Sequence, residues 1–277
     1  MNRAPIPWVI KVGGDELLPG PALGQFVLWV AREVRRGQPI VIVHGGGDEV
    51  SARATQLGLE TEKREGQRVT PAEMLEVVAE VLAGRVNVRL TNALESAGVP
   101  AVGLTGVSGR ILPVRAAGSP PGSLGWVGEP EPARTRLLLK MFEGGLTPIV
   151  APLGTDENGG VYNVNADAAA AAIAGALGAA LYLVSDVPAV LDAKGHAVPE
   201  LSAGEVQRMV REGIARDGMI PKLRAALRAT ESGAASAWIG SLASLGDDAA
   251  HPKGGTLVGG RRRASLPLLS APPAGGT

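Results

Sequence analysis

Two glycine-rich turns, each placed after a run of apolar residues, are the first feature of this sequence that could support chemistry. The run from Trp8 to Val12 ends at Gly13 and Gly14, and the run Pro39 to Val43 is followed by His44-Gly45-Gly46-Gly47. Glycines between a buried strand and the start of a helix expose backbone N–H groups to an anion such as phosphate. Tight turns alone would also explain each set, but the pair of turns, with Lys11 beside the first, favours an anion site.

A second polar cluster, Asn163-Val164-Asn165-Ala166-Asp167, precedes an alanine-rich stretch. Strand periodicity places the two asparagines on one face, and Asp167 falls in the first turn of the expected helix. Asn and Asp favour helix starts, and an acid there suits the helix dipole. One such residue suffices for a cap, so capping and ligand binding both remain open for this cluster.

Further polar positions give weaker signals. Lys11 ends an otherwise apolar strand, where a lysine either reaches solvent or points its ammonium at a phosphate. Ser185 and Asp186 follow another apolar run, where an Asp is commonly a loop cap. Lys222 lies in Asp217-Gly218-Met219-Ile220-Pro221-Lys222, before a helix, where a cation opposes the dipole and hints at a compensating group.

Composition and missing motifs exclude several kinds of site. The chain has no Walker-type phosphate loop and no nucleophile elbow, and Val50 stands where a dinucleotide motif needs its third glycine. Cysteine is absent and the three histidines lack metal-ligand spacing, so no protein metal site is expected. The formal net charge of zero argues against nucleic acid as a partner. No signal peptide or membrane-spanning run is recognisable, so a soluble, cytoplasmic protein without a membrane partner is expected.

The elements that must position these residues alternate between strands and helices. With 277 residues, 45% of them apolar, the chain can bury a sizeable core. Apolar residues at helical spacing predict a helix over Pro21 to Arg36, between the two glycine turns. This order is typical of parallel βαβ units with both sheet faces covered. Later strands are expected at Leu181–Val184, Trp238-Ile239 and Thr256–Val258.

Hairpins and helix caps complete the expected elements. Glu62 to Val69, centred on Glu65-Gly66, predicts a hairpin lid, and Asn158-Gly159 predicts the turn of a second hairpin between Leu153–Thr155 and Val161–Asn165. Capping boxes are expected at Thr70-Pro71-Ala72-Glu73 and Ser202-Ala203-Gly204-Glu205, and a helix from about Ala166 can end at Gly178. From Gly259 the chain has little to bury, so residues 259–277 are expected to be a disordered tail.

Taken in order, these segments resemble the amino-acid kinase family, over nearly everything up to Val258. No single motif is specific, but their order and spacing are. The segments that carry the resemblance are Ile10–Gly14, Ile42–Gly47, Gly66–Thr70, Ala83–Asn87, Val102–Gly106, Pro148–Gly154, Asn163–Asp167, Leu183–Pro188 and Asp217–Lys222.

The resemblance implies an α/β fold, a three-layer αβα sandwich around an open, mainly parallel sheet. It implies a lobe over residues 1–180 for acyl amino acid binding and dimerisation, and a lobe over 181–258 for ATP. The activity implied is transfer of a phosphoryl group from ATP, with Mg²⁺, to the γ-carboxylate of N-acetyl-L-glutamate. A carboxylate is already a nucleophile, so alignment and charge dispersal would suffice for catalysis.

The resemblance also assigns roles to single residues. Lys11 and Lys222 would neutralise charge on the transferring phosphoryl group, Asp167 would organise both lysines, and Gly45 and Gly46 would donate backbone hydrogen bonds. The acyl amino acid would be bound by Gly46, Gly47, Arg68, Asn163 and Asn165. The nucleotide would be bound by Gly13, Gly14, Ser185, Asp186, Met219 and Lys222.

Three departures from the family pattern stand out. Thr105 replaces a serine found in many relatives, the region Ala243 to Lys253 lacks the usual helix signal, and the usual Gly-x-Gly-Thr is reduced to Gly254-Gly255-Thr256. They concern the local fold rather than the chemistry.

Two other functions are alternatives to phosphoryl transfer to free N-acetyl-L-glutamate. One is a kinase for aminoadipate or glutamate linked to an acidic carrier protein, for which Lys63, Arg64 and Arg68 offer only a thin basic surface. The other is a non-catalytic amino-acid sensor, which would not need Lys11, Asp167 or Lys222. A homodimer insensitive to arginine is expected, because arginine-inhibited hexamers of the family carry a helix before the first strand, and here only Met1 to Pro7 precede it.

Overall fold

A computed structural model describes residues 5–64, 66–118, 120–216, 218–246 and 252–260 of the chain. Its helices are η1 (Gly14–Leu17), α1 (Pro21–Arg35), α2 (Gly47–Gln56), α3 (Ala72–Ala79), η2 (Glu80–Val86), α4 (Asn87–Ser96), η3 (Ser108–Arg110), α5 (Arg136–Glu143), α6 (Ala166–Leu177), α7 (Ala203–Arg211), α8 (Met219–Glu231) and α9 (Leu242–Leu245). Its strands are β1 (Trp8–Val12), β2 (Ile40–His44), β3 (Lys63–Arg64), β4 (Gln67–Arg68), β5 (Ala101–Thr105), β6 (Val114–Ala116), β7 (Val127–Pro130), β8 (Thr147–Ala151), β9 (Leu153–Thr155), β10 (Val161–Val164), β11 (Ala180–Val184), β12 (Glu200–Leu201), β13 (Ser236–Gly240) and β14 (Thr256–Val258).

An eight-stranded sheet in the order β12-β14-β13-β11-β1-β2-β8-β5 runs through the middle of the molecule. Its neighbours pair in parallel, apart from the antiparallel pair β13 and β14. The predicted mainly parallel sheet is therefore confirmed. Because β1 and β2 are direct neighbours, the turns that follow them lie at the same edge of the sheet.

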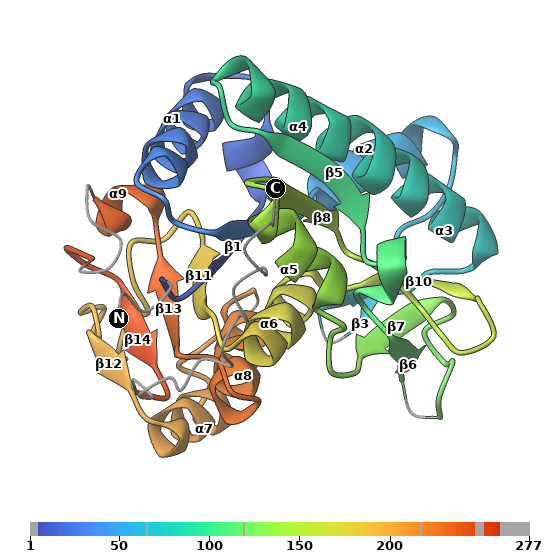
Figure 1. Cartoon of the computed structure of the whole chain (residues 1–277). Helices are drawn as coiled ribbons and strands as arrows, with labels where there is room; N and C mark the ends of the chain where they lie inside the picture. The colour runs from blue at the N-terminus through green and yellow to red at the C-terminus, as the bar shows by residue number, and fades with distance from the viewer. Residues whose placement is uncertain (1–4, 65, 119, 217, 247–251, 261–277) are drawn as a thin grey trace, which may run out of the picture.

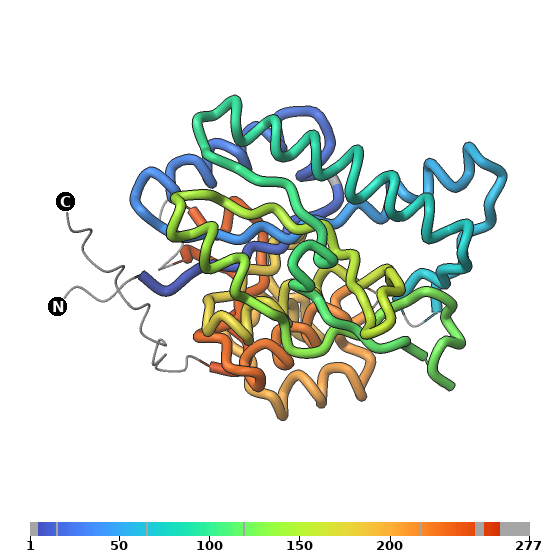
Figure 2. Tube along the Cα trace, turned by 45° about the vertical axis from the view of Figure 1, so that its right-hand side comes forward, coloured from blue at the N-terminus to red at the C-terminus, as the bar shows by residue number. Residues whose placement is uncertain are grey.

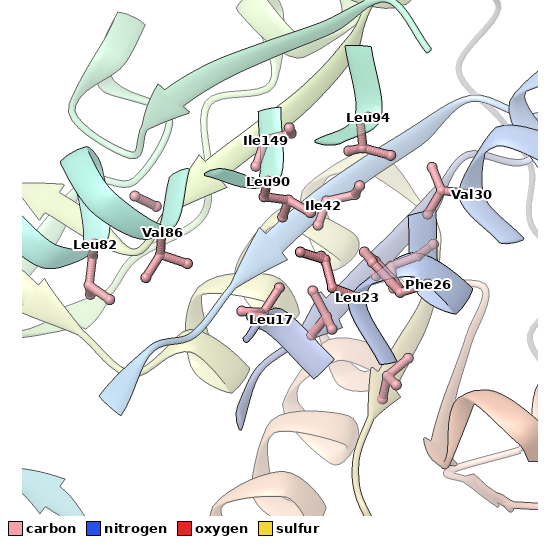
Figure 3. Packing of buried hydrophobic residues seen from close by; sticks show 14 of the residues in the cluster. Leu17, Leu23, Phe26, Val30, Ile42, Leu82, Val86, Leu90, Leu94 and Ile149 are labelled. Atoms are coloured by element: carbon pink, nitrogen blue, oxygen red, sulfur yellow. The ribbon is translucent and has the colours of Figure 1, made fainter. Parts of the chain in front are cut away.

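Alternating strand residues bury opposite faces of this sheet. Ile10 and Ile42 belong to a core shared with α1 to α4, whereas Val9 and Val43 belong to a core shared with α5 to α8. Figure 1 shows α1, α2 and α4 on one side of the sheet and α6 and α8 on the other. The predicted three-layer sandwich is confirmed. The residues labelled in Figure 3 give the first of these cores: Leu17, Leu23, Phe26, Val30, Ile42, Leu82, Val86, Leu90, Leu94 and Ile149.

One uninterrupted helical run crosses the first layer. It starts as α3, continues through the π-helical segment η2 and ends as α4, as Figure 2 shows along the chain trace. The π segment contributes Leu82 and Val86 to the core, and Asn87, where α4 begins, is also buried. This run lies directly over the second glycine turn, since a Cβ on Gly46 would approach Leu82 Cδ2 to 2.8 Å.

Two smaller sheets lie beside the carboxyl edge of the large sheet. Strands β6-β7-β10-β9 form a four-stranded sheet that contains the predicted hairpin of β9 and β10. Strands β3 and β4 form the predicted lid hairpin, with Lys63 opposite Arg68. The expected centre of its turn, Glu65, lies outside the described residues.

Helix ends agree with the sequence at some positions and differ at one. Asn165 Oδ1 accepts a hydrogen bond from Ala168 N, Gly178 ends α6 in the left-handed conformation (φ 62°), and Ser202 with Glu205 forms the expected capping box. The capping box predicted at Thr70 is wrong. Its hydroxyl instead donates to Arg68 O at 2.7 Å and accepts from Asn163 Nδ2 at 3.1 Å, so tertiary partners replace the cap.

The described residues that follow β13 pack around Trp238 of that strand. Residues 242–245 form the short helix α9, and Trp238 Nε1 donates to Gly254 O at 2.9 Å. Gly255 has φ +88°, and a Cβ there would meet the indole ring at 2.3 Å, so this position requires glycine. Of the tail expected over 259–277, Gly259 and Gly260 are described, and Gly259 N donates to Leu201 O at 2.8 Å; residues 247–251 and 261–277 lie outside the described part of the chain.

Candidate active site

The two glycine turns contact each other through their backbones. Lys11 pairs with Val43 and Val12 with His44 across β1 and β2. Gly45 N donates to Val12 O at 2.7 Å, and a Cβ on Gly45 would lie 3.4 Å from Gly13 Cα. At this separation a methyl group on Gly45 would already be in van der Waals contact with the first turn, so little space remains between the two turns. The glycines therefore allow two chain segments to approach one ligand from adjacent strands.

The hydrogen bond from Gly45 revises one expected role. Its N–H is already bound to Val12 O, so the donors that face a ligand at this turn belong to the residues that follow. Within the described part of the chain, no group accepts from Gly46 N, and no side chain caps the start of α2. The N–H groups of Gly46 and Gly47 thus combine with the positive end of the α2 dipole.

Two lysines and one aspartate meet beside these turns. Lys11 Nζ lies 3.0 Å from Asp167 Oδ1, and Lys222 Nζ lies 4.0 Å from Asp167 Oδ2. The exposed fractions of the three side chains are 11%, 7% and 15% for Lys11, Asp167 and Lys222. Burial lowers the pKa of Lys222, and Asp167 is the largest opposing influence. Because two ammonium groups surround one carboxylate, the trio carries net positive charge in a largely buried environment, where charges interact strongly.

Each member of this trio comes from a different element. Lys11 lies on β1 on the side of the sheet that faces α6, Asp167 occupies the first turn of α6, and Lys222 occupies the first turn of α8. Lys222 opposes the dipole of α8, and Asp167 supplies the compensating charge that the sequence hinted at. Helices α6 and α8 pack against each other, which brings the last two residues together.

A cavity of about 230 Å³ opens over the turns. Its polar lining contains most of the predicted site: Lys11, Gly13, Gly14, Gly45, Gly46, Gly47, Arg68, Asn163, Asn165 and Asp167. Its apolar lining consists of Val50, Val78, Leu82, Val127, Pro152, Val164 and Ala166. One end of the cavity can thus contact an anion, while methyl groups line other parts of its wall.

Arg68 is held at this cavity with part of its guanidinium unpaired. The residue is only 9% exposed, and its Nη2 donates to Gly47 O at 2.8 Å and Ser51 Oγ at 2.7 Å. Among the described residues, Nη1 is buried without a hydrogen-bond partner, and no carboxylate lies within 4.0 Å of the guanidinium. Burial lowers the pKa of Arg68, and the charge of Asp48 opposes this. An arginine keeps its charge, so a bound anion would satisfy this group.

The two asparagines have different environments. Asn165 caps α6, whereas Asn163, two residues earlier on β10, donates through Nδ2 to Thr70 Oγ1 at 3.1 Å. Both residues line the cavity. Capping therefore accounts for Asn165, and Asn163 is the surplus residue, free of any role in the helix start.

The predicted nucleotide residues divide into two groups: Gly13 and Gly14 line this cavity, whereas Ser185, Asp186, Met219 and Lys222 lie outside its wall. Ser185 Oγ donates to Asp186 Oδ1 at 2.9 Å just after β11, and Met219 begins α8 one turn before Lys222. The charge of Asp186 raises the pKa of Lys222, which places the two groups in one neighbourhood. Asp217, from the same motif, lies outside the described residues.

Sequence reasoning missed Ser51 and the apolar wall of the cavity. Ser51 follows Gly47 by one helical turn on α2, so the helical period could have placed it beside the glycines. Val127 and Val164 lie on strands of the four-stranded sheet, and no sequence pattern indicates how that sheet lies against the turns.

A second cavity, of about 680 Å³, is larger but distant from this chemistry. Trp8, Ala180 and Ser236, which line it, are the first residues of their strands, so it lies at the amino edge of the sheet. None of the predicted site residues lines it. We therefore take the smaller cavity as the candidate active site.

Two kinds of feature are absent from the described residues. No group of three or more His, Asp or Glu residues is arranged to hold a metal ion there. None of the helices in those ranges combines the length and apolar character that crossing a membrane requires.

Comparison with known proteins places this geometry in context. Residues 7–241 match the model of the amino acid kinase family. The acetylglutamate kinase of Geobacillus kaustophilus is 42% identical over 228 residues, which cover 80% of this chain and 84% of that protein. The acetylglutamate kinase of Chloroflexus aurantiacus is 42% identical over 246 residues, which cover 86% of this chain and 93% of that protein.

Solved structures give the same fold. The structure of smu.665 from Streptococcus mutans UA159 superimposes with a TM-score of 0.78 at 28% identity, over 91% of this chain and 97% of that one. Carbamate kinase from Giardia lamblia bound to AMP-PNP superimposes with a TM-score of 0.67 at 19% identity, over 92% of this chain and 98% of that one. The second likeness concerns the fold alone.

Proposed function

This chain belongs to the amino acid kinase family, and from that premise we propose that it transfers the γ-phosphoryl group of ATP to the γ-carboxylate of N-acetyl-L-glutamate. The products are ADP and N-acetyl-L-glutamyl 5-phosphate, and the step belongs to arginine biosynthesis. A carboxylate oxygen attacks the γ-phosphorus while the bond from that phosphorus to the ADP oxygen breaks.

The observation that most supports the proposal is the trio of Lys11, Asp167 and Lys222 beside the N–H groups of Gly46 and Gly47. A carboxylate approaching a polyphosphate is repelled by it, and negative charge spreads over the phosphoryl oxygens in the transition state. Two ammonium groups and a helix N-terminus fixed in a dry site stabilise that charge without reorganising. No general base is required, because the acceptor is already ionised at neutral pH.

The acceptor end of the cavity fits a second carboxylate. Arg68 presents a buried Nη1 without a partner, and Asn163 lies on the same cavity. In this proposal Arg68 and Asn163 bind the α-carboxylate of the acyl amino acid, with Asn165 close by. The apolar wall that includes Leu82 and Val127 is suited to the acyl group.

ATP enters as its magnesium complex in this proposal. The described residues offer no cluster of carboxylates that would bind a resident metal, so the phosphate oxygens themselves would hold Mg²⁺. Gly13 and Gly14 would approach the phosphates, and Ser185, Asp186, Met219 and Lys222 would line the nucleotide site. Residues 1–180 would then form the acyl amino acid lobe, and 181–258 the nucleotide lobe.

A homodimer in the cytoplasm completes the proposal. Strand β5 ends the order of the eight-stranded sheet, so one side of its backbone lacks a neighbouring strand among those described. Such edges are candidates for pairing or for being covered. Sedimentation equilibrium of the purified chain tests this state, and a monomer or a hexamer would contradict it.

The two competing functions predict different surfaces. A kinase for a carrier-linked substrate needs a basic entrance, but Arg64 Nε lies 2.6 Å from Glu62 Oε1, which offsets its charge. An amino-acid sensor would have no use for two lysines around a buried aspartate. Free N-acetyl-L-glutamate and catalysis therefore have the stronger support.

Trapping the acyl phosphate tests the function. Purified protein is incubated with MgATP, N-acetyl-L-glutamate and hydroxylamine, which converts an acyl phosphate to a hydroxamate. We expect hydroxamate and ADP in equal amounts, little product with unacylated glutamate, and at most about 1% of the wild-type rate from Lys11→Ala protein purified in parallel. Product only with a carrier-linked substrate would favour the first competing function, and no ADP with any acceptor would favour the sensor.

A further inference from the structure

His44 is a fully buried side chain next to the second glycine turn. It is the last residue of β2, its exposed fraction is 0%, and it lies on the side of the sheet covered by α4. Its Nδ1 is 2.9 Å from Gly45 O, and its Nε2 is 3.1 Å from Asn87 Nδ2. Both ring nitrogens therefore have polar partners in an otherwise apolar layer.

Asn87 determines which nitrogen of the ring carries hydrogen. Its Nδ2 also lies 3.2 Å from Leu104 O and 3.2 Å from Ile149 O. Backbone carbonyls only accept hydrogen bonds, so the amide nitrogen must face them, and it also faces the ring. If His44 Nε2 carried a hydrogen, two N–H donors would face each other at 3.1 Å and neither could accept a hydrogen bond. The ring is thus held with its hydrogen on Nδ1, which donates to Gly45 O.

The neutral ring is also favoured by its surroundings. Burial is the main cause that lowers the pKa of His44 to about 4; the hydrogen bond with Gly45 O opposes it, the charge of Arg89 adds to it, and the charge of Glu49 opposes it. A proton added at Nε2 would have no acceptor. The Nδ1–H form is therefore the one present at neutral pH.

The Gly45 carbonyl belongs to the same peptide unit as Gly46 N–H. The two groups point in opposite directions because the peptide is planar and trans. Glycine on both sides gives this unit unusual freedom to rotate, and Gly46 has φ 146° and ψ 24°. Gly45 N–H is held by its hydrogen bond to Val12 O, and Gly45 O is held by the hydrogen bond from His44 Nδ1.

We propose that His44, held in its Nδ1–H tautomer by Asn87, is a positioning residue that fixes the Gly45–Gly46 peptide so that Gly46 N–H points at the transferring phosphoryl group. The inference rests on the proposed phosphoryl transfer for its role in the reaction, and on the hydrogen bonds alone for the tautomer. His44 itself touches neither substrate, because the glycine turn lies between its ring and the cavity.

Asn87 is held in place from the other side by β5. A Cβ on Gly103 would lie 2.1 Å from Asn87 Oδ1, so the absence of a side chain there leaves room for the amide. Asn87 is 5% exposed and starts α4 directly after the π segment. Contacts thus run without a break from β5 to Asn87 of α4, from Asn87 to His44, and from His44 to the glycine turn.

The tautomer can be measured without any assay of activity. The chain has three histidines, so protein labelled with ¹⁵N-histidine gives few ring signals, and His44→Asn protein identifies those of His44. Long-range ¹H–¹⁵N spectra distinguish the two neutral tautomers. We expect the Nδ1–H form, unchanged from pH 8 to about pH 5. The Nε2–H form, or a ring that titrates near its ordinary pKa, would overturn the inference.

Kinetics tests the positioning role. His44→Leu removes the donor, whereas the shorter amide of His44→Asn keeps an N–H near the place of Nδ1. We expect His44→Leu to lower kcat by about 10- to 100-fold, with both KM values within about threefold, since the lost alignment acts on the transition state. His44→Asn is expected to recover most of kcat.

Each outcome has a defined meaning. An equal decrease in kcat in His44→Leu and His44→Asn, or a rise in KM without a decrease in kcat, would overturn the positioning role. Thermal melts of both variants are compared first, and if His44→Leu does not fold, His44→Asn against His44→Gln gives the same contrast. If wild-type protein forms no hydroxamate from N-acetyl-L-glutamate, the proposed function fails, while the tautomer measurement still decides the hydrogen-bond arrangement.

Discussion

Asp167 lies between two ammonium groups that would repel each other without it. We predict that Lys11→Ala and Lys222→Ala each lower kcat by about 10²- to 10³-fold, the scale for losing one fixed transition-state donor. Asp167→Asn keeps the shape of the side chain but removes the charge that holds both lysines, so a comparable loss is expected with a modest change in ATP binding. Steady-state kinetics of the single variants measures these effects.

A double-mutant cycle decides whether the three residues act together. Combining Lys11→Ala with Asp167→Asn should cost much less than the two single losses together, because one charge arrangement is disrupted in each case. Thermal melts confirm that each variant folds. Strict additivity would separate the residues, and wild-type activity in Asp167→Asn would reduce Asp167 to an ordinary first-turn acid.

Arg68 differs from the lysines because it would bind a group that does not react. We predict that Arg68→Ala raises KM for N-acetyl-L-glutamate with little change in kcat, at a cost of about 2–4 kcal/mol in kcat/KM. Arg68→Lys should recover only part of this, since an ammonium lacks the planar fork of donors with which Arg68 binds Gly47 O and Ser51 Oγ and would bind a carboxylate.

Ser51→Ala is the matched control for the Arg68 variants. It removes one of the groups that hold the guanidinium but leaves its charge and the bond to Gly47 O. A small rise in KM is expected. If Arg68→Ala lowered kcat and left KM unchanged, the arginine would be acting on the phosphoryl group.

Residue types predicted the site better than they predicted its hydrogen bonds. The sequence placed Lys11, both asparagines and Asp167 near the glycine turns, because strand ends and helix starts converge at one sheet edge. It could not show that Gly45 N is bonded to Val12 O, or that the Thr70 hydroxyl faces Asn163. Those bonds join segments far apart in the chain, and local propensity carries no information on them.

At the scale of elements, one arginine connects the supports of both glycine turns. Arg89 on α4 donates through Nε to Leu17 O of η1 at 2.9 Å and through Nη1 to Glu49 Oε2 of α2 at 3.1 Å. Its other Nη atom also contacts Glu49. Because η1 follows the first turn and α2 follows the second, this side chain fixes the distance between them.

We predict that Arg89→Lys destabilises the fold by about 1–3 kcal/mol, because a largely buried Glu49 and Leu17 O lose hydrogen bonds that an ammonium cannot replace together. The kcat should fall as well, since the turns are less well aligned. Urea unfolding and kinetics on the same preparation measure both effects.

Arg53→Lys provides the comparison within the same helix layer. Arg53 of α2 pairs with Glu80 of η2 at 3.0 Å, but both side chains are substantially exposed. Its replacement should change stability by less than about 0.5 kcal/mol and leave kcat unaltered. Equal effects of the two substitutions would mean that Arg89 has no special part in aligning the turns.

Element types could be read from the sequence more readily than their exact pairing. Apolar runs, glycine turns and helical spacing predicted β1, α1, β2 and α6 with nearly correct limits. The π-helical register of η2 was not predicted, because it depends on Leu82 and Val86 packing over a glycine turn. The antiparallel direction of β14 depends on the path of the chain after β13, which three strand residues cannot indicate.

At the scale of the whole molecule, the large sheet buries the imidazole ring of His44 completely. His44 lies on β2, next to β1, and β1 pairs with β11, so protonating the ring affects strands in the middle of the eight-stranded sheet. Its pKa is lowered to about 4 by burial in the folded chain and is close to 6.5 in the unfolded chain. Between these values the unfolded state binds a proton that the folded state does not.

The sign of the resulting pH dependence follows from that difference. Stability falls as pH decreases below about 6.5, and the part due to His44 approaches about 3 kcal/mol near pH 4, since one pKa unit corresponds to about 1.4 kcal/mol. We predict that the free energy of unfolding of wild type, measured with urea between pH 7 and 4.5, falls more steeply than that of His44→Asn. The other titratable groups are the same in both proteins, so their contributions to the pH dependence cancel when the two curves are compared. Parallel curves would mean that the folded chain takes up the proton on Nε2 at the ordinary pKa, which the amide N–H of Asn87 could not accommodate without moving away from the ring.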